Sequence, residues 1–362
     1  MAAVLDRLRR HRILAALPLL EATSVIAPKS ADADSFVEAL YERGWITSYQ
    51  RQALMRRDQL LSLSHYQLLE RLGSGGVSHV YKVRDTRTNR LAALKVLHED
   101  AQTNPETLAR FEREITVATH LVHPNIVQAI DADIAAGKVA YLAMEFLPGI
   151  DLSHVLIQAT RVALQPACVY IAQAALGLQH AHENGLIHRD IKPANLLVTV
   201  PDSPTAPTAA EVAQSSDGKV LKILDLGLAR TQRSSQSDVG MSVTGHGTLL
   251  GTPDYMAPEQ GRDPRGVDIR ADIYSLGCTF FHLLTGKVPF DGGNVMQKLF
   301  RHVSEPPPRV ERYLPNVPKP LADLVAWMIT KTPAERPPQP WIVAKRLQAL
   351  GLIDSLPIPN LT

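Results

Sequence analysis

The chain has 362 residues, of which 45% are hydrophobic and 20% are charged, and its formal net charge is +2. This composition excludes a disordered polymer, and the small net charge excludes a chain whose whole surface attracts nucleic acid. The length suits one large bilobal domain or two modest ones, and either can bury a hydrophobic core. The two cysteines, Cys168 and Cys278, have a spacing that resembles no disulfide or metal framework, which favours a reducing compartment and predicts a cytoplasmic location.

The N-terminal stretch MAAVLDRLRRHRILAALPLLEA imitates a secretory signal, because arginines precede an apolar run. Pro18 and Glu21 interrupt that run early, so we do not expect a signal peptide. The sequence contains no run that approaches the roughly 18 to 20 apolar residues needed to span a bilayer. We therefore expect no membrane partner for the chain as given.

Residues 1–62 have the composition of a small helical module. Apolar residues recur at helical spacing, with Asp34 or Ser35 as the N-cap and Gly44 as the end of the helix. A second helix is expected to begin near Thr47. Two roles remain open for the module: a structural cap on the domain that comes after it, or a docking or dimerisation element.

A change of pattern near residue 65 predicts a small antiparallel sheet. Short apolar runs alternate with turn residues, as in YQLLERL, HVYKVRD and RLAALKVL. A helix with Asn104 as its N-cap and Pro105 at its first position comes next, and two more strand-like runs end near Gly149. Helical patterns dominate beyond Gly149, so the fold class is α+β: helices, a small sheet with one main helix, then a larger helical region.

Two segments differ from these regular patterns. Residues 199–218 are rich in Pro, Thr, Ala and Ser, which predicts a flexible, solvated insertion between two strand-like runs. Residues 230–252 form a hydroxyl-rich stretch of a length that is usual for functional or disordered loops.

The segment LIHRDIKPANLLV, residues 186–198, concentrates polar side chains between two apolar runs. If this loop is tight, Asp190 and Asn195 face the same site, where the carboxylate can accept or orient a proton and the amide can hold a hard cation. Further along, Asp225 follows an apolar strand and precedes a glycine, a position suited to coordinating magnesium.

The segment RLGSGGVSHVYKV, residues 71–83, has the pattern of a loop that wraps phosphates, with Ser78 where the third glycine usually stands. The motif AALK, which ends at Lys95, lies between this loop and the HRD and DLG motifs. A lone motif arises by chance, whereas all of them in this order do not. Over about residues 66 to 350, the chain resembles the eukaryotic-like (Hanks-type) serine/threonine protein kinases found in bacteria.

The resemblance implies a bilobal protein-kinase fold, in which a small antiparallel-sheet lobe with one main helix precedes a larger, mostly helical lobe. The kinase domain would span residues 63–352, with the small lobe at about 63–147 and the large lobe at about 148–352. The N-terminal module of residues 1–62 would precede it and a tail of residues 353–362 would follow.

The resemblance also implies the roles of individual residues. Asp190 would act as the base or orient the acceptor hydroxyl, Lys192 would contact the γ-phosphate, and Asn195 and Asp225 would hold the metal. Lys95 would bind the α- and β-phosphates and pair with a glutamate on the following helix. The residues implied to bind ATP come from the glycine-rich loop, the next strand, that helix and the hinge: Leu72, Gly73, Ser74, Gly75, Gly76, Val77, Ser78, Val80, Ala93, Lys95, Glu114, Met144, Glu145, Phe146 and Leu147.

The activation segment follows the DLG motif in such kinases. Arg189 would receive a phosphorylated hydroxyl of this segment; among the candidates Ser242, Thr244 and Thr248, the two threonines are favoured as phosphosites. Thr252 would face the substrate's acceptor site.

Other matching positions imply structural roles. Glu259 would pair with Arg336, Asp272 would brace the catalytic loop, and His188 would pack beneath it. Leu226 replaces the usual phenylalanine of the DFG motif, at the position whose packing sets the active and inactive states.

We therefore predict an ATP- and Mg²⁺-dependent kinase, with Mn²⁺ as an alternative metal, that phosphorylates serine and threonine in protein substrates and is regulated by autophosphorylation. Its partners would be proteins and not nucleic acid, with homodimerisation through the small lobe or the N-terminal helices left open. A pseudokinase that serves as a nucleotide-binding scaffold is the alternative. A small-molecule kinase of the same fold is disfavoured, because Thr252 and Glu259 match a protein-substrate segment.

Overall fold

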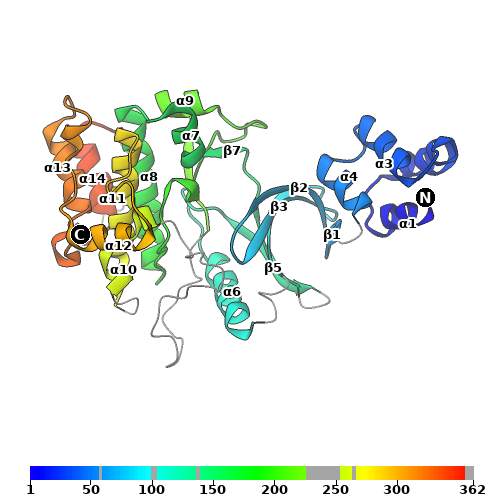
Figure 1. Ribbon diagram of the computed structural model, residues 1–362, viewed down its shortest axis with the longest axis horizontal. Coiled ribbons are helices and arrows are strands. Elements are labelled where there is room, and N and C mark those ends of the chain that lie inside the picture. The colour runs from blue at the N-terminus through cyan, green and yellow to red at the C-terminus, as the bar shows by residue number, and fades with distance from the viewer. Residues whose placement is uncertain (57–58, 99–103, 136–138, 226–252, 263–265, 355–362) are drawn as a thin grey trace. The chain divides into compact units, whose positions relative to one another are not determined.

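A computed structural model describes residues 1–56, 59–98, 104–135, 139–225, 253–262 and 266–354 (Figure 1). The chain divides into two compact units. The first unit comprises Met1–Ala109 and Ala129–Phe146, and the second comprises Arg110–Gln128 and Leu147–Thr362. The N-terminal module and the predicted sheet therefore belong to the same unit, and the larger helical region belongs to the other.

The N-terminal module consists of short helices around a core of their own. In chain order these are α1 (Ala2–Arg10), α2 (Ala16–Glu21), the π-helical turn η1 (Ala22–Ile26), the 3₁₀ turn η2 (Ala27–Lys29), α3 (Ala33–Glu42) and α4 (Ser48–Met55). Their buried apolar side chains form one cluster with those of the connecting segments: Val4, Leu8, Ile13, Leu14, Ala22, Ile26, Phe36, Val37, Leu40, Ile46, Ala53, Leu54 and Leu61. This core confirms the helical module predicted from the sequence.

The N-cap of α3 is Asp32, so the predicted caps Asp34 and Ser35 are wrong. Asp32 Oδ1 accepts a hydrogen bond from Ser35 N at 2.7 Å, and Ser35 Oγ accepts one from Asp32 N at 3.1 Å. Ser35 therefore lies at the third helical position, where its hydroxyl completes a capping box. Gly44, with a φ of +67°, follows the helix as predicted, and Thr47 is the N-cap of α4 as predicted.

The first unit also contains a six-stranded antiparallel sheet in the order β1-β2-β3-β4-β6-β5. The strands are β1 (Ser62–Leu63), β2 (Tyr66–Ser74), β3 (Ser78–Asp85), β4 (Leu91–Leu97), β5 (Ala129–Ala135) and β6 (Val139–Glu145). One cluster of buried side chains links β1, β2, β3, β4 and β6: Leu63, Tyr66, Leu68, Tyr81, Val83, Ala92, Leu94, Val96, Tyr141 and Ala143. The chain between β4 and β5 contains helix α6 (Pro105–Ala118), whose predicted N-cap Asn104 accepts from Thr107 N at 3.1 Å through Oδ1.

Two almost fully buried helices, α8 (Leu164–Glu183) and α11 (Ile269–Thr285), form the centre of the second unit. They pack against each other, α8 also packs against α14 (Trp341–Ala349), and α11 packs against α13 (Lys319–Met328). Gly277 permits this last contact, because a Cβ atom there would lie 2.7 Å from the Cβ of Met328. Cys278 is fully buried in α11, in agreement with the sequence prediction of a core cysteine.

The remaining elements of the second unit lie around these helices (Figure 1). A three-stranded sheet joins β7 (Gly149–Asp151), β8 (Leu196–Thr199) and β9 (Val220–Ile223) in that order. The shorter helices are α7 (Leu152–Ala159), η3 (Pro193–Asn195), η5 (Pro253–Tyr255), α10 (Pro258–Arg262), α12 (Val295–Ser304), η6 (Val310–Arg312) and η7 (Pro333–Glu335). None of the helices within the described ranges has the length and apolar character that crossing a membrane requires.

The segment of residues 199–218 differs from the expected flexible insertion, because it contains helix α9 (Ala209–Gln214). Thr208 and Glu211 form a capping box at its start, and small apolar residues of α9 are buried where it packs against α7. The hydroxyl of Tyr170, a buried residue of α8, lies 3.0 Å from the carbonyl oxygen of Ser215 and 3.2 Å from that of Val212. The Pro- and Ser-rich composition conceals these anchors, since each of them is short.

We expect Tyr170→Phe to loosen this insertion. The change removes the one O–H donor that the carbonyl groups of Val212 and Ser215 share, and the first of these contacts is buried, so the free energy of unfolding should fall by about 1–2 kcal/mol. Amide hydrogen exchange in residues 209–216 should increase more than elsewhere in the second unit. Tyr41→Phe, at a partly exposed tyrosine of α3, is the control, and equal exchange in both variants would contradict the anchoring role.

Candidate active site

The segment His188–Asp190 is held to α11 by one buried carboxylate. Asp272 is fully buried; its Oδ2 accepts from His188 N at 2.7 Å and its Oδ1 accepts from Arg189 N at 2.6 Å. Burial raises the pKa of Asp272 above its ordinary value, against the lowering effect of His188, Arg189 and the two N–H donors. Arg189 has a φ of +65°, a left-handed conformation that non-glycine residues rarely adopt, so this carboxylate holds a backbone turn that is costly by itself.

His188 is the packing residue that the sequence predicted. Its side chain is fully buried, and Nε2 lies 3.0 Å from the carbonyl oxygen of Leu224, at the end of β9. The imidazole therefore links the loop to the strand that leads to Asp225, and it has no access to a substrate.

Asp190, Lys192 and Asn195 converge on one another, as the sequence predicts for a tight loop. Lys192 Nζ lies 2.8 Å from Asp190 Oδ2. Asn195 Nδ2 donates to the Asp190 carbonyl oxygen at 2.7 Å and to Oδ2 at 3.1 Å. Because Oδ2 receives two donors, Oδ1 is the carboxylate oxygen best placed to accept a hydrogen bond from an incoming hydroxyl.

Asp225 comes directly after a residue whose backbone is hydrogen-bonded to that of Asn195. Leu224 N donates to the Asn195 carbonyl oxygen at 2.9 Å, and Asp225 comes next with a φ of +45°. The amide nitrogen of Asn195 is committed to Asp190, so its Oδ1 is the atom left to act as a ligand. Carboxylate and amide oxygens are the donors that Mg²⁺ and Mn²⁺ take, and the pair Asn195 and Asp225 therefore fits a divalent cation.

The strand residues predicted to bind ATP share one face of the sheet in the first unit. Val80 of β3 lies opposite Lys95 of β4, and Ala93 lies opposite Met144 of β6. Successive side chains of a strand alternate between faces, so Ala93 and Lys95 point to the same side. Glu145 and Phe146 come after Met144 at the end of β6.

The glycine-rich hairpin between β2 and β3 closes through a hydrogen bond from Gly75 N to the Ser78 carbonyl oxygen, 2.8 Å long. Gly73 and Gly75 do not have positive φ values, and a Cβ atom would meet nothing within 4 Å at Gly73 and nothing nearer than 3.7 Å at Gly75. Neither backbone conformation nor internal packing therefore requires glycine at these positions. Close approach of a ligand to the backbone is the remaining physical reason, as for a phosphate cradle.

The predicted site residues are distributed over both units. Those from Leu72 to Lys95 and from Met144 to Phe146 belong to the first unit, whereas Leu147 and the catalytic residues belong to the second. The side chain of Glu114 lies outside the described structure. The activation-segment positions also lie outside the described residues: Leu226, Ser242, Thr244, Thr248 and Thr252.

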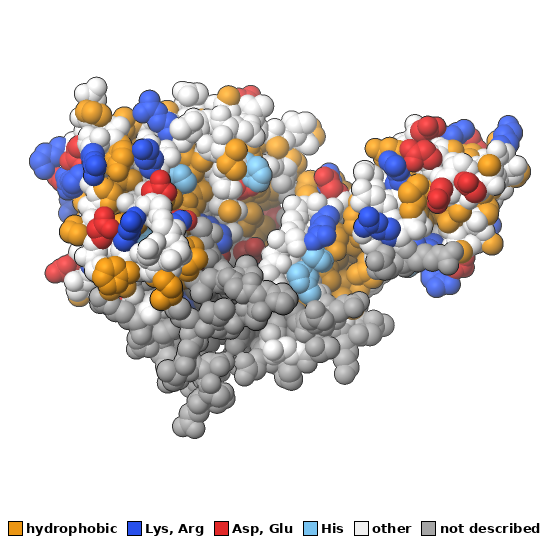
Figure 2. Space-filling model, in the orientation of Figure 1, with side chains coloured by type: hydrophobic (Ala, Val, Ile, Leu, Met, Phe, Trp, Pro, Cys, Tyr) orange, Lys and Arg blue, Asp and Glu red, His pale blue; other side chains and the backbone are white. Residues whose placement is uncertain are grey.

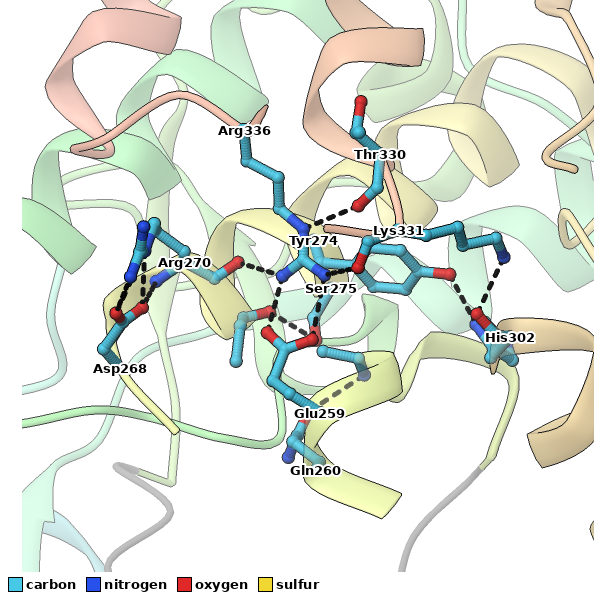
Figure 3. Close-up of polar contacts among 12 residues, drawn as sticks. Glu259, Gln260, Asp268, Arg270, Tyr274, Ser275, His302, Thr330, Lys331 and Arg336 are labelled. Carbon is cyan, nitrogen blue, oxygen red and sulfur yellow. Dashed lines mark hydrogen bonds and ion pairs between the residues drawn. The ribbon is translucent and has the colours of Figure 1, made fainter. Parts of the chain in front are cut away.

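Glu259 and Arg336 form the predicted ion pair (Figure 3). Arg336 Nη1 lies 2.6 Å from Glu259 Oε1 and Nη2 lies 2.8 Å from Oε2, and the arginine side chain is fully buried. Arg336 also donates to the carbonyl oxygens of Thr330, Lys331 and Arg270. This bidentate pair fixes α10 to the helical core.

Sequence reasoning missed two neighbours of this pair. Gln260 Nε2 donates to the Arg189 carbonyl oxygen at 2.9 Å, so the segment after Pro253–Tyr255 also contacts the catalytic loop. Lys331 Nζ donates to the His302 carbonyl oxygen at 2.8 Å at the end of α12, and burial lowers the pKa of Lys331 to about 8 (Figure 3). The position of Gln260 directly after Glu259 is a sequence signal that could have identified it, whereas a lone lysine in a loop carries none.

Comparison with known proteins identifies the family. The family model described as "Protein kinase domain" matches residues 66–347. The chain belongs to the protein kinase family. The kinase is 35% identical over 274 residues to serine/threonine-protein kinase PknB of Mycolicibacterium smegmatis, a match that covers 75% of this chain and 40% of that protein.

Other relatives of the chain are also protein kinases. The kinase is 37% identical to PknB of Mycobacterium tuberculosis, over 67% of this chain and 36% of the relative, and 30% identical to pkn3 of Myxococcus xanthus, over 79% and 50%. The crystal structure of the Mycobacterium tuberculosis PknI kinase domain superposes with a TM-score of 0.58 at 26% identity, covering 80% of this chain and 97% of that one. The kinase thus spans between about a third and a half of the length of these full-length curated relatives, which are bacterial serine/threonine kinases, and its family uses ATP and a divalent metal.

We expect Asp272→Asn to reduce the rate of the proposed phosphoryl transfer by at least about tenfold, equivalent to ~1.4 kcal/mol in the barrier. An asparagine can accept only one of the two N–H groups and presents an NH₂ group to the other, so the loop loses its fixed position. Steady-state kinetics with ATP measure this change. Asp268→Asn is the control, because asparagine also caps helices well and Asp268 is the N-cap of the same helix; similar rates in both variants would contradict the bracing role.

We expect Glu259→Gln to lower the free energy of unfolding by about 3 kcal/mol, because it leaves the buried guanidinium of Arg336 without its counter-charge. Urea unfolding of the second unit measures the loss. Glu305→Gln provides the comparison, since Glu305 pairs with Arg301 at 3.5 Å on the surface and should contribute less than about 0.5 kcal/mol. A similar decrease in the free energy of unfolding of both variants would contradict a stabilising role for the buried pair.

Proposed function

We propose that the chain is an active serine/threonine protein kinase that transfers the γ-phosphoryl group of ATP to protein hydroxyls. The observation that supports this most directly is the convergence of Lys192 Nζ and Asn195 Nδ2 on one oxygen of Asp190. Such a group is pre-formed for phosphoryl transfer, in which positioning and electrostatic stabilisation supply most of the rate acceleration.

Each side chain then has a role in the proposed reaction. Asp190 accepts the hydrogen bond of the substrate hydroxyl and takes its proton, while Lys192 contacts the γ-phosphate and offsets its negative charge. Asn195 and Asp225 hold Mg²⁺, or Mn²⁺ as the alternative. ATP would supply the phosphoryl group, and the metal would neutralise the negative charge of the phosphates. Lys95 and the glycine-rich loop bind the phosphates, and Lys95 pairs with Glu114.

A pseudokinase scaffold is the alternative function, and the residues present argue against it. All five side chains that the chemistry needs occur in the sequence: Lys95, Glu114, Asp190, Asn195 and Asp225. A scaffold that only binds nucleotide has no use for the hydrogen bonds that orient Asp190. Turnover is therefore the better proposal.

The regulation and partners are proposed on the resemblance to bacterial kinases. Autophosphorylation would fall on Thr244 or Thr248, with Arg189 as the receiving cation, and Thr252 would face the acceptor hydroxyl. The partners would be protein substrates in the cytoplasm, with homodimerisation through the small lobe or N-terminal helices as an option. Basic and acidic side chains are interspersed on the face drawn in Figure 2, which favours protein partners over nucleic acid.

Incubation with Mg·ATP, followed by mass spectrometry of phosphosites, tests this function. We expect phosphate on Thr244 or Thr248 and on a generic basic protein, and a decrease of at least about 100-fold in Asp190→Asn, the loss typical of a removed general base. Asp217→Asn, at an exposed aspartate of the insertion, should retain the rate. Nucleotide binding without any transfer by the wild type would favour the scaffold, and an active enzyme that leaves both threonines unmodified would overturn the regulatory proposal.

A further inference from the structure

Strand β2 is irregular just before the glycine-rich loop. Leu68 pairs with Val83 and Glu70 pairs with Lys82, so Leu69 is an extra residue without a partner on β3. A second register shift lies between Arg71 and Gly73. Such bulges bend a strand and change the direction of the residues beyond them, which here form the glycine-rich hairpin.

The N-terminal module supplies hydrogen-bond donors to the first of these bulges. Thr47 Oγ1 donates to the Leu69 carbonyl oxygen at 2.5 Å, and Gln50 Nε2 donates to the Leu68 carbonyl oxygen at 2.9 Å. Gln50 is only 2% exposed, so its amide is committed to this contact. The carbonyl that the bulge removes from the β2–β3 ladder is therefore satisfied by a residue from outside the sheet.

Both side chains have a second task at the start of α4. Thr47 Oγ1 accepts from Gln50 N at 3.2 Å, and Gln50 Oε1 accepts from Thr47 N at 3.0 Å, which makes a capping box. Each side chain accepts a hydrogen bond within the helix and donates one to β2. A capping box that served only the helix would not need to be buried against a strand.

Aromatic side chains extend the contact toward the tip of the hairpin. The rings of Tyr49 and Tyr81 meet edge to face at 5.6 Å between centroids, and Tyr81 meets His79 at 6.0 Å. His79 pairs with Ser74 at the end of the hairpin, and its Nδ1 lies 3.0 Å from Ser74 Oγ. From α4 to the loop tip the chain of contacts is continuous.

We propose that the N-terminal module is a positioning element of the kinase, in which Thr47 and Gln50 hold the bulge of β2 and so set the position of the glycine-rich loop for ATP. Thr47 and Gln50 precede the part of the chain that matches the kinase family model, which begins at residue 66, whereas the bulge that they hold lies inside it. Neither residue belongs to the predicted ATP contacts; both act through the backbone of β2. The effect on ATP rests on the proposed function, whereas the effect on the hairpin does not.

Gln50→Glu tests the proposal, because glutamate is an equally good capping residue at this position but its carboxylate has no N–H to donate. At pH 8 we expect the KM for ATP to rise at least about threefold, because the carboxylate loses the donor and is buried beside the Leu68 carbonyl oxygen, while kcat changes less than about twofold. Amide exchange in residues 71–79 should accelerate. Gln297→Glu is the control for the capping function alone, since Gln297 has the same place in the exposed capping box of α12.

Thr47 provides a second pair of variants. Thr47→Ser retains the hydroxyl and should behave as wild type, whereas Thr47→Val should reproduce the change in KM and in exchange. A lower melting temperature in Gln50→Glu and Thr47→Val with unchanged KM and unchanged exchange in the hairpin would mean a purely structural cap, and would overturn the proposal. Should the wild type show no turnover, calorimetric binding of Mg·ADP replaces KM: weaker binding with faster exchange supports the positioning role, and unchanged binding contradicts it.

Discussion

The arrangement of the catalytic residues depends on one buried carboxylate. Two consecutive backbone N–H groups, at His188 and Arg189, point at the oxygens of Asp272, and one of the two residues has a left-handed backbone. Each of these N–H groups would cost about 1–3 kcal/mol if it were buried without a partner. The turn is therefore held in place by α11. This prior organisation lets Asp190 and Asn195 meet at fixed distances, which is what catalysis by positioning requires.

The convergence within the catalytic loop could be predicted from the sequence, because its signals are local. The segment HRDIKPAN places its polar residues within one turn-rich loop, so their convergence could be inferred from spacing alone. The pairing of Glu259 with Arg336 and the bracing of His188 by Asp272 came from family resemblance, since 77 and 84 residues separate the partners. The contacts of Thr47 and Gln50 with β2 could not be predicted. Their spacing of three indicates a capping box, and nothing in that pattern tells which strand their spare donors will meet.

A sequence pattern does not show which groups meet in space. This limit also explains the wrong predictions for the N-cap of α3 and for residues 199–218. Asp32, Asp34 and Ser35 are all good capping residues, and only the geometry of the first turn decides among them. In the insertion, a composition typical of solvated loops outweighs one capping box and a few small apolar residues. Composition averages over a segment, whereas a short helix needs only a handful of well-placed residues and a surface such as α7 to cover them.

The double use of the capping box in α4 has a consequence for how the protein folds. Helix α4 cannot complete its first turn in the native way without Thr47 and Gln50, and these side chains reach their full set of partners only when β2 is bulged beside them. Isolated helices as short as α4 are not stable in water, so this helix gains its order from the sheet. The end of the helical module near residue 62 is thus a boundary in composition, and we expect α4 and β2 to form and melt together.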